Sequence, residues 1–130
     1  MPEPRQSASK TLRQLEAAVK EARAFYGIDP LYDTPVRADL SGGSSTQIRI
    51  EPGYFHRPIS VDLDYYQRNP HLIREDMAHE VAHLVTDELA CMFQRLPPEL
   101  RDEGEPLAML LIDALERATV RLERMFTRHA

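Results

Sequence analysis

Apolar residues recur at steps of three and four positions near the start of the chain, which predicts an amphipathic helix there. The apolar positions are Leu12, Leu15, Val19, Ala22 and Phe25. Ser7 or Ser9 can cap the start of this helix, because a serine hydroxyl accepts a hydrogen bond from a free backbone N–H group. Gly27, followed by Asp29-Pro30, ends the helix, and residues 1–7 are expected to form a flexible lead.

Between positions 36 and 63 the pattern changes to short strands separated by turn residues. Strands are predicted at Val36–Leu40, at Gln47–Ile50 and at about Pro58–Leu63, with glycine- or proline-containing turns between them. In the third strand the apolar residues alternate with Ser60 and Asp62 and would face the core; they are Ile59, Val61 and Leu63. We expect the three strands to form a small antiparallel sheet.

Helical periodicity returns in the second half and predicts two more helices. The first, called the motif helix here, would begin at Asn69-Pro70 and end at about Leu96, before Pro97-Pro98. Its buried side would carry Ile73, Met77, Val81, Leu84, Leu89, Met92 and Phe93. A closing helix would begin near Pro106, with an apolar stripe formed by Leu107, Leu111, Ala114, Ala118, Leu122 and Met125. Together these elements predict an α+β fold.

The composition is that of one globular domain covering residues 1–130, with 42% hydrophobic and 28% charged residues. The net charge of −5 gives no basic field to attract nucleic acid or anionic lipid, and no apolar run is long enough to span a membrane. The start of the chain lacks the apolar segment of a signal peptide, so we expect a cytoplasmic protein. Cys91 is the only cysteine, which excludes an intrachain disulfide and a cysteine-based zinc site and favours a small packed residue.

The candidate chemistry lies in an H-E-x-x-H motif, formed by His79, Glu80 and His83 within the predicted motif helix. Residues four apart share a helix face, about 6 Å apart along the axis, so both imidazoles can bind one zinc ion at about 2.0–2.1 Å. Glu80 is rotated by about 100° from His79, where its carboxylate can accept a proton from a zinc-bound water. Chance would produce this motif about 0.02 times in such a composition, and the alternative is two exposed histidines beside a surface glutamate.

Two histidines do not make a tight zinc site, so a third protein ligand is expected. Asp87 follows His83 by four positions, but on a straight helix it lies about 12 Å from His79 along the axis. No glycine breaks the motif helix to bring Asp87 back toward the histidines. We therefore expect the third ligand to come from another segment, and the closing helix is the obvious source.

The carboxylates of the closing helix differ in their neighbours. Asp113 has Arg117 four positions later, which is typical of an exposed ion pair. Glu116 lies in a second stripe that is otherwise apolar or uncharged, formed by Met109, Ile112, Thr119 and Val120. A carboxylate placed there is costly to bury unless it is paired or bound to a metal. Glu116 is therefore the predicted third ligand, with Glu123 and Asp87 as the alternatives.

Three segments together resemble the small zincin-like metallopeptidases of phages and prophages, namely residues 57–61 (RPISV), 79–85 (HEVAHLV) and 116–122 (ERATVRL). The resemblance covers roughly residues 10–128 by the order of its elements. It implies a zincin-like single domain with an amino-terminal helix, a small antiparallel sheet, an H-E-x-x-H helix and a closing helix. In related gluzincins a glutamate on the helix after the motif helix completes the site, which favours Glu116. The chain departs from the family in carrying Val81 where leucine is commoner, and no counterpart of the oxyanion-stabilising Tyr or His is found.

Several other polar residues are weaker candidates. His56 is interpreted as a surface or packing residue, and His71 as a residue near the start of the motif helix. Tyr65-Tyr66, in the predicted loop before that helix, would either reach the mouth of the site or cover the helix start. Asp76 and Asp87 are candidate hydrogen-bond acceptors for the imidazole N–H groups, with surface charge as the alternative.

The resulting hypothesis is a zinc-dependent peptidase-like hydrolase that acts on a peptide or protein substrate, with Glu80 as the general base. An edge strand could hold an extended peptide by backbone pairing. The alternative is a non-catalytic binding or virion-associated module, in which zinc only ties the last two helices together. A zinc hydrolase of non-peptide amides is a third possibility.

Overall fold

The computed structural model describes residues 5–42, 46–48, 55–87, 95, 97–101 and 106–129. Most of these residues are helical and a small part forms one sheet, which agrees with the predicted α+β class. The elements in chain order are α1 (Ala8–Tyr26), β1 (Val36–Arg37), β2 (Thr46–Ile48), β3 (Ile59–Val61), α2 (Leu63–Arg68), the 3-10 helix η1 (Pro70–Leu72), α3 (Ile73–Ala82), the 3-10 helix η2 (His83–Thr86), α5 (Pro98–Arg101) and α6 (Pro106–His129). No helix within the described ranges is long and apolar enough to cross a membrane.

The first helix begins and ends at the capping residues that the sequence predicts. Ser7 is the N-cap, and its hydroxyl accepts a hydrogen bond of 3.2 Å from the backbone N–H of Lys10. Gly27 ends the helix in the left-handed conformation, with φ of 65°, which costs a glycine little because it has no Cβ. The prediction for α1 is confirmed, with Ser7 rather than Ser9 as the cap.

The sheet is mixed rather than wholly antiparallel, and its strand order is β1-β3-β2. β2 pairs antiparallel with β3, but β1 pairs parallel with it, with Val36 opposite Ile59. The antiparallel prediction was wrong for β1, which does not pair with the next strand in the chain, β2, but runs parallel to β3. β3 takes the central place because it is buried on both faces, including Ser60.

The segment after β3 turns at once into a short helix that the sequence did not predict. The carboxylate of Asp62 caps α2 by accepting a hydrogen bond of 3.2 Å from the backbone N–H of Tyr65. Asp62 is therefore a buried cap residue, and Leu63 begins a helix rather than ending a strand. Tyr66 is fully buried and Tyr65 half-buried, which favours the prediction that these rings cover the start of the motif helix.

Over the part of the chain that the structure describes, the motif helix is helical as predicted, but it is not one continuous α-helix. It starts with the 3-10 turn η1 at Pro70, continues as α3, and narrows into the 3-10 helix η2 from His83 onward. The predicted buried residues Ile73, Met77, Val81 and Leu84 are all buried. The predictions for Leu89, Cys91, Met92, Phe93 and the helix end at Leu96 lie outside the described residues.

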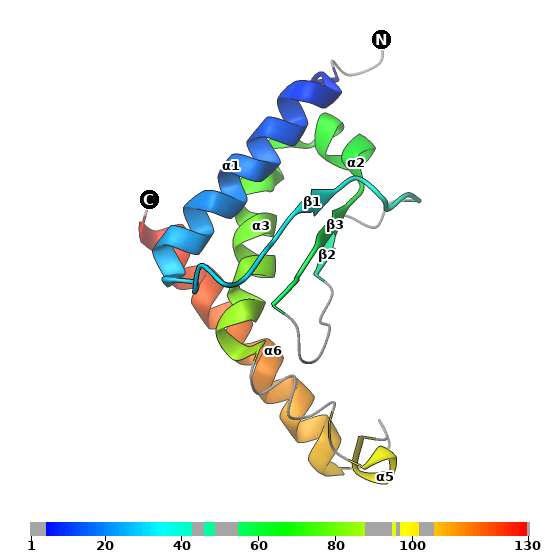
Figure 1. Ribbon diagram of the computed structural model, residues 1–130, viewed down its shortest axis with the longest axis vertical. Coiled ribbons are helices and arrows are strands. Elements are labelled where there is room, and N and C mark those ends of the chain that lie inside the picture. Colours follow the sequence, from blue (N-terminus) through cyan, green and yellow to red (C-terminus); the bar gives the residue numbers. More distant parts are fainter. Residues whose placement is uncertain are drawn as a thin grey trace.

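α1 and α3 lie side by side, with the sheet on one side of them and α6 crossing the end of α3 (Figure 1). The core between these elements contains Leu15, Ala18, Val19, Ala22, Ile59, Val61, Tyr66, Ile73, Met77, Ala78, Val81, Leu84 and Phe126. The C-terminal ends of α1 and α6 meet here, because Phe126 of α6 contacts the ring of Phe25 of α1 at a centroid distance of 5.3 Å. Burial raises the pKa of Tyr26 to about 12, with Glu123 adding to the effect, so its hydroxyl stays protonated and donates to Leu122 O at 2.8 Å.

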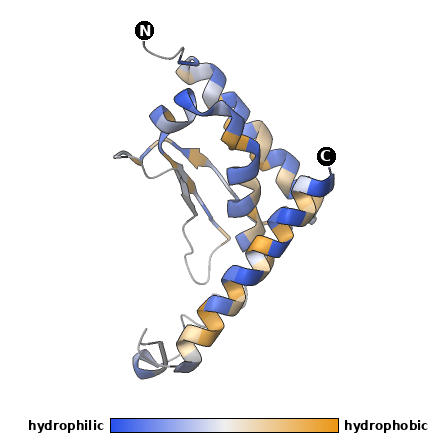
Figure 2. Ribbon diagram, turned by 180° about the vertical axis from the view of Figure 1, so that it is seen from behind, coloured by the Kyte–Doolittle hydropathy of each residue, from blue (hydrophilic) through white to orange (hydrophobic). Residues whose placement is uncertain are grey.

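The apolar stripe predicted for α6 coincides only in part with the face of α6 that packs against α3 and η2. Ala114 and Met125 are exposed, whereas Ala108, Thr119 and Phe126 are buried. The reason is that α6 crosses α3 and η2 at one region instead of running along them, so its contact face is set by the crossing. The first half of α6 extends away from α1 and α3, toward α5 (Figure 2), and it carries exposed apolar residues, among them Met109 and Leu110.

A buried ion pair joins Asp87, the residue after η2, to the segment before β3. The guanidinium of Arg57 donates to both carboxylate oxygens of Asp87, through Nε and Nη2, each at 3.0 Å. The two side chains are only 2% and 4% exposed. The hydroxyl of Tyr32 donates a further hydrogen bond of 2.7 Å to the same carboxylate. Asp87 therefore holds η2, the turn that begins with His83, in place against the sheet side of the molecule.

Candidate metal centre

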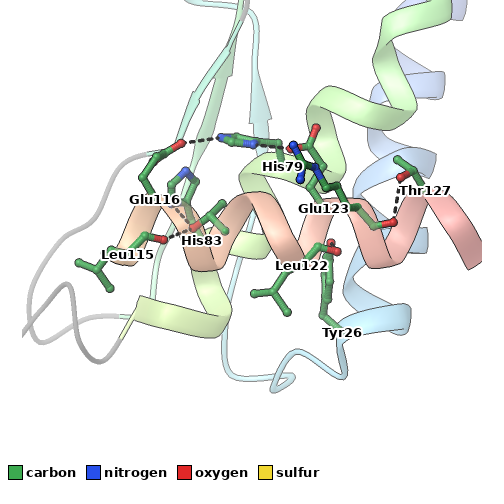
Figure 3. A network of polar contacts seen from close by, with 10 residues as sticks. Tyr26, His79, His83, Leu115, Glu116, Leu122, Glu123 and Thr127 are labelled. Atoms are coloured by element: carbon green, nitrogen blue, oxygen red, sulfur yellow. Dashed lines mark hydrogen bonds and ion pairs between the residues drawn. The ribbon is translucent and has the colours of Figure 1, made fainter. Parts of the chain in front are cut away.

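Three residues with metal-binding side chains come together where α6 crosses the motif helix. His79 lies in the last turn of α3, His83 is the first residue of η2, and Glu116 lies in the middle of α6. One ligand atom of each residue lies within 4.8 Å of the other two, and Nε2 of His79 is 3.6 Å from Oε1 of Glu116. Figure 3 shows both imidazoles and the Glu116 carboxylate gathered on the same side of α6. The three predicted ligands are thus brought together by the fold.

The Nδ1 atom of each histidine ring contacts a side chain of α6. Nδ1 of His79 is 3.0 Å from Oε2 of Glu123, and Nδ1 of His83 is 3.3 Å from the hydroxyl of Thr119. The Thr119 hydroxyl donates its only hydrogen to Leu115 O at 2.9 Å, so it accepts from the His83 ring. Both rings therefore carry a hydrogen on Nδ1, and each neutral ring has its free lone pair on Nε2. A lone pair on Nε2 is what a metal ion needs.

The electrostatics of the two histidines differ. Burial alone would lower the pKa of His79, but the hydrogen bond with Glu123 and the charges of Glu80, Glu123 and Glu116 outweigh it and raise this pKa. Burial lowers the pKa of His83, and the neighbouring His79 adds to this, although Glu116 opposes it. The carboxylates of Glu80, Glu116 and Glu123 thus surround the two rings, and their negative charge favours a positive charge at this place. A divalent cation fits this excess of negative charge better than a single proton does.

Glu80, the predicted general base, lies on α3 directly after His79 and is 7% exposed. Its charge is one of the causes that raise the pKa of His79, so the carboxylate lies close to that ring. No ligand atom of Glu80 belongs to the three-residue cluster found among the described residues. This placement agrees with a carboxylate beside a metal rather than on it.

The surroundings of Glu116 differ from those that the sequence predicted. The sequence argument placed it among buried neighbours, but its side chain is 56% exposed, and Met109 and Ile112 are exposed as well. An open hollow of about 470 Å³ lies beside it, lined by Met109, Ile112, Asp113 and Glu116. The burial argument for Glu116 was therefore wrong. Its closeness to His79 and His83 is what makes it a candidate ligand.

The alternative ligands and the predicted hydrogen-bond acceptors have other roles. Both carboxylate oxygens of Asp87 accept hydrogen bonds from Arg57 or Tyr32, and Asp87 does not belong to the metal-binding group found among the described residues. Asp76 accepts a hydrogen bond of 2.7 Å from the hydroxyl of Tyr66 instead of one from a histidine. Burial raises the pKa of Asp76, which this hydrogen bond partly opposes. The partners of Asp87 come from distant segments of the chain, whereas the partner of Asp76 lies ten positions earlier, in α2.

The remaining predictions concern the surface. Asp113 and Arg117 form the expected exposed ion pair, with 2.7 Å between Oδ2 and Nη2. His56 lies at the surface, where Nδ1 is 2.9 Å from Oδ2 of Asp33, and His71 is exposed on η1. Neither histidine belongs to the metal-binding group found in the described ranges.

The roles of Thr119 and Glu123 were not predicted from the sequence. Glu123 was named only as an alternative ligand and Thr119 only as a neighbour of Glu116, yet each contacts a histidine ring. The available signal was their spacing, because they follow Glu116 by three and seven positions and so share its helix face. Comparisons with protein-family models, with curated proteins and with solved structures found no match for this chain.

Proposed function

We propose that the chain binds one zinc ion through His79, His83 and Glu116 and acts as a zinc-dependent peptidase-like hydrolase with a zincin-like fold. The observation that carries this proposal is the convergence of the three side chains, with each Nδ1 already engaged by α6. Tetrahedral zinc with bonds of about 2.0–2.1 Å holds its ligand atoms about 3.3 Å apart. The 3.6 Å between Nε2 of His79 and Oε1 of Glu116 is close to that value, and the three ligand atoms all lie within 4.8 Å of one another, which supports the proposal.

A bound zinc ion would supply Lewis-acid chemistry, lowering the pKa of a water molecule and polarising a substrate carbonyl. Glu80 would then accept the proton that the attacking water loses, and it would pass this proton to the leaving amine. The buried position of Glu80 shields the proton transfer from bulk water. The protein thus supplies the metal ligands and the base from α3, η2 and α6.

A peptide is the substrate class that the surroundings of the site favour. β2 is an edge strand of the sheet and contacts α3, so an extended chain can pair with this edge near the motif helix. The hollow next to Glu116 is lined by the apolar side chains of Met109 and Ile112 and can accept an apolar substrate residue. Both features support an extended peptide with an apolar residue near the scissile bond.

The second candidate function is a non-catalytic module in which zinc joins two helices. It is favoured by one observation, that the candidate ligands come from both sides of the contact between the motif helix and α6. Glu80 is also only 7% exposed, which limits the access of a substrate to the base. Metal binding is common to both functions, and peptide hydrolysis separates them.

Replacing either motif histidine should abolish zinc binding. We expect about one zinc per chain in the purified wild type and none in His79→Ala or His83→Ala, because two remaining ligands hold zinc weakly. Elemental analysis after dialysis measures this directly. His56→Ala is the matched control, since His56 pairs with Asp33 at the surface and should keep the full zinc content. Full zinc occupancy in the double variant His79→Ala/His83→Ala would contradict the site.

Glu116→Gln should weaken zinc binding strongly, because an amide oxygen is a much poorer ligand than a carboxylate. A chelator should lower the melting temperature of the wild type, since zinc stabilises the folded state that binds it, and should change that of the variant little. Asp113→Asn removes the same charge one turn earlier on α6 and should behave as wild type, because its partner is the exposed Arg117. Equal zinc affinity of Glu116→Gln and wild type would remove Glu116 from the site.

A further inference from the structure

α6 presents three polar side chains to the two motif histidines along a single helix face. Glu116, Thr119 and Glu123 follow one another at steps of three and four positions, which places them in one row. The row faces α3 and η2, where Thr119 is fully buried and the Glu123 side chain is 17% exposed. In Figure 3, Glu116 and Glu123 lie on opposite sides of the His79 ring.

The contacts of this row divide into two kinds. Glu116 approaches His79 at Nε2, the nitrogen that is available for a metal. Glu123 contacts the same ring at Nδ1, and Thr119 contacts the His83 ring at Nδ1. The last two contacts are made at the nitrogens that face away from the candidate metal position. Glu123 and Thr119 therefore act on the rings and not on the ion.

We propose that Glu123 and Thr119 are positioning residues, which hold the His79 and His83 rings in the orientation that binds zinc. This inference rests on the proposed zinc site and extends it to the next layer of contacts. Each acceptor selects the ring form with its hydrogen on Nδ1, and it stops the ring from rotating about the Cβ–Cγ bond. α6 thus supplies one ligand and the orientation of the other two.

The two acceptors differ in strength. Glu123 is a carboxylate in a largely buried place, so its hydrogen bond to the imidazole is charge-assisted and makes His79 a better electron donor to the metal. Thr119 is a neutral acceptor whose orientation is fixed by donation to Leu115 O. We therefore expect the loss of Glu123 to weaken zinc binding more than the loss of the Thr119 hydroxyl.

The inference is tested by measuring zinc affinity in competition with a chromophoric chelator, on the full chain with zinc alone as the ligand. Glu123→Leu removes the acceptor and keeps the size of the side chain, and we expect it to weaken zinc binding by about 10- to 100-fold. Glu123→Gln retains an acceptor oxygen and should recover part of the affinity. Thr119→Val should lose affinity by a smaller factor, and Thr119→Ser should regain it. Asp113→Asn is the control for loss of a carboxylate from α6 and should bind as wild type.

Two further measurements distinguish positioning of the histidine rings by Glu123 and Thr119 from a general effect on stability. The melting temperature of each metal-free variant reports stability without zinc, and the absorption spectrum of the cobalt-substituted protein reports the geometry of the ligands. We expect Thr119→Val to change the cobalt spectrum while its metal-free melting temperature stays close to that of Thr119→Ser. A loss of affinity that only follows the loss of stability, with an unchanged cobalt spectrum, would overturn the inference.

The zinc affinities of the wild type and the variants distinguish an error in the positioning roles from an error in the zinc site itself. A wild-type chain that binds no zinc would end both. A wild-type chain that binds zinc with the same affinity as Glu123→Leu and Thr119→Val would end only the positioning roles. If Glu123→Leu lost its zinc completely while Glu116→Gln kept it, Glu123 would be the ligand itself and the inference would be wrong.

Discussion

Glu80→Gln should retain about one zinc per chain and the melting temperature of the wild type, but should lose peptide hydrolysis by a factor of about 10²–10⁴. Glutamine has nearly the same shape as glutamate, so the packing around this 7% exposed side chain changes little. Its amide cannot accept the proton from the attacking water. The measurement is the cleavage of a broad peptide library, followed by mass spectrometry, with zinc-loaded protein at matched concentrations.

Two outcomes would count against this role. If Glu80→Gln cleaved peptides at the wild-type rate, another group would be the base. If the zinc-loaded wild type cleaved no member of the library, the non-catalytic module would be the better account of the site. Glu75→Gln is a suitable control, because Glu75 is an exposed carboxylate on the first turn of the same helix and should not affect turnover.

Asp87→Asn should lower the free energy of unfolding by about 3–5 kcal/mol, the range found when one partner of a buried ion pair is removed. The change takes the negative charge away from a carboxylate that accepts hydrogen bonds from Arg57 and Tyr32 inside the protein. Urea unfolding of the metal-free protein measures the loss without interference from zinc binding. We expect the midpoint to fall sharply with little change in the slope, since the folded core is the same.

The chain offers a matched control for this effect in Asp113, which pairs with Arg117 in the open. Asp113→Asn should change the free energy of unfolding by less than about 1 kcal/mol, because water screens an exposed pair. Replacing both buried partners, as in Arg57→Met/Asp87→Leu, should recover much of the stability that Asp87→Asn loses. A loss of under about 1 kcal/mol in Asp87→Asn would show that the buried pair has no special weight.

Local signals in the sequence were sufficient for most helices but not for the sheet. Ser7 and Gly27 mark the ends of α1 because capping depends on residues next to the helix. Strand pairing depends on distant residues, and nothing near β1 indicates that β3 rather than β2 will be its neighbour. Asp62 was also mispredicted. The alternating pattern placed it in the third strand, but it caps α2 where the chain turns into that helix.

In the candidate site, too, the residues set by local spacing were predictable and those set by distant contacts were not. His79 and His83 were predictable because their spacing and the helix geometry alone bring them together. The contribution of α6 depends on the angle at which it crosses the motif helix, and periodicity does not give this angle. Glu116 was therefore chosen partly for a burial that it does not have, and the contact of Glu123 with His79 was not foreseen.

The hydrogen bond from Tyr26, at the end of α1, to Leu122 of α6 joins residues that are 96 positions apart. We expect contacts of such long range to form late in folding, because closing the loop between them costs conformational entropy. α6 must dock on α1 and α3 before Glu116, Thr119 and Glu123 can meet the histidines. The metal centre is then among the last parts of the molecule to assemble, so a bound ion would act mainly as a brake on unfolding rather than as a nucleus for folding.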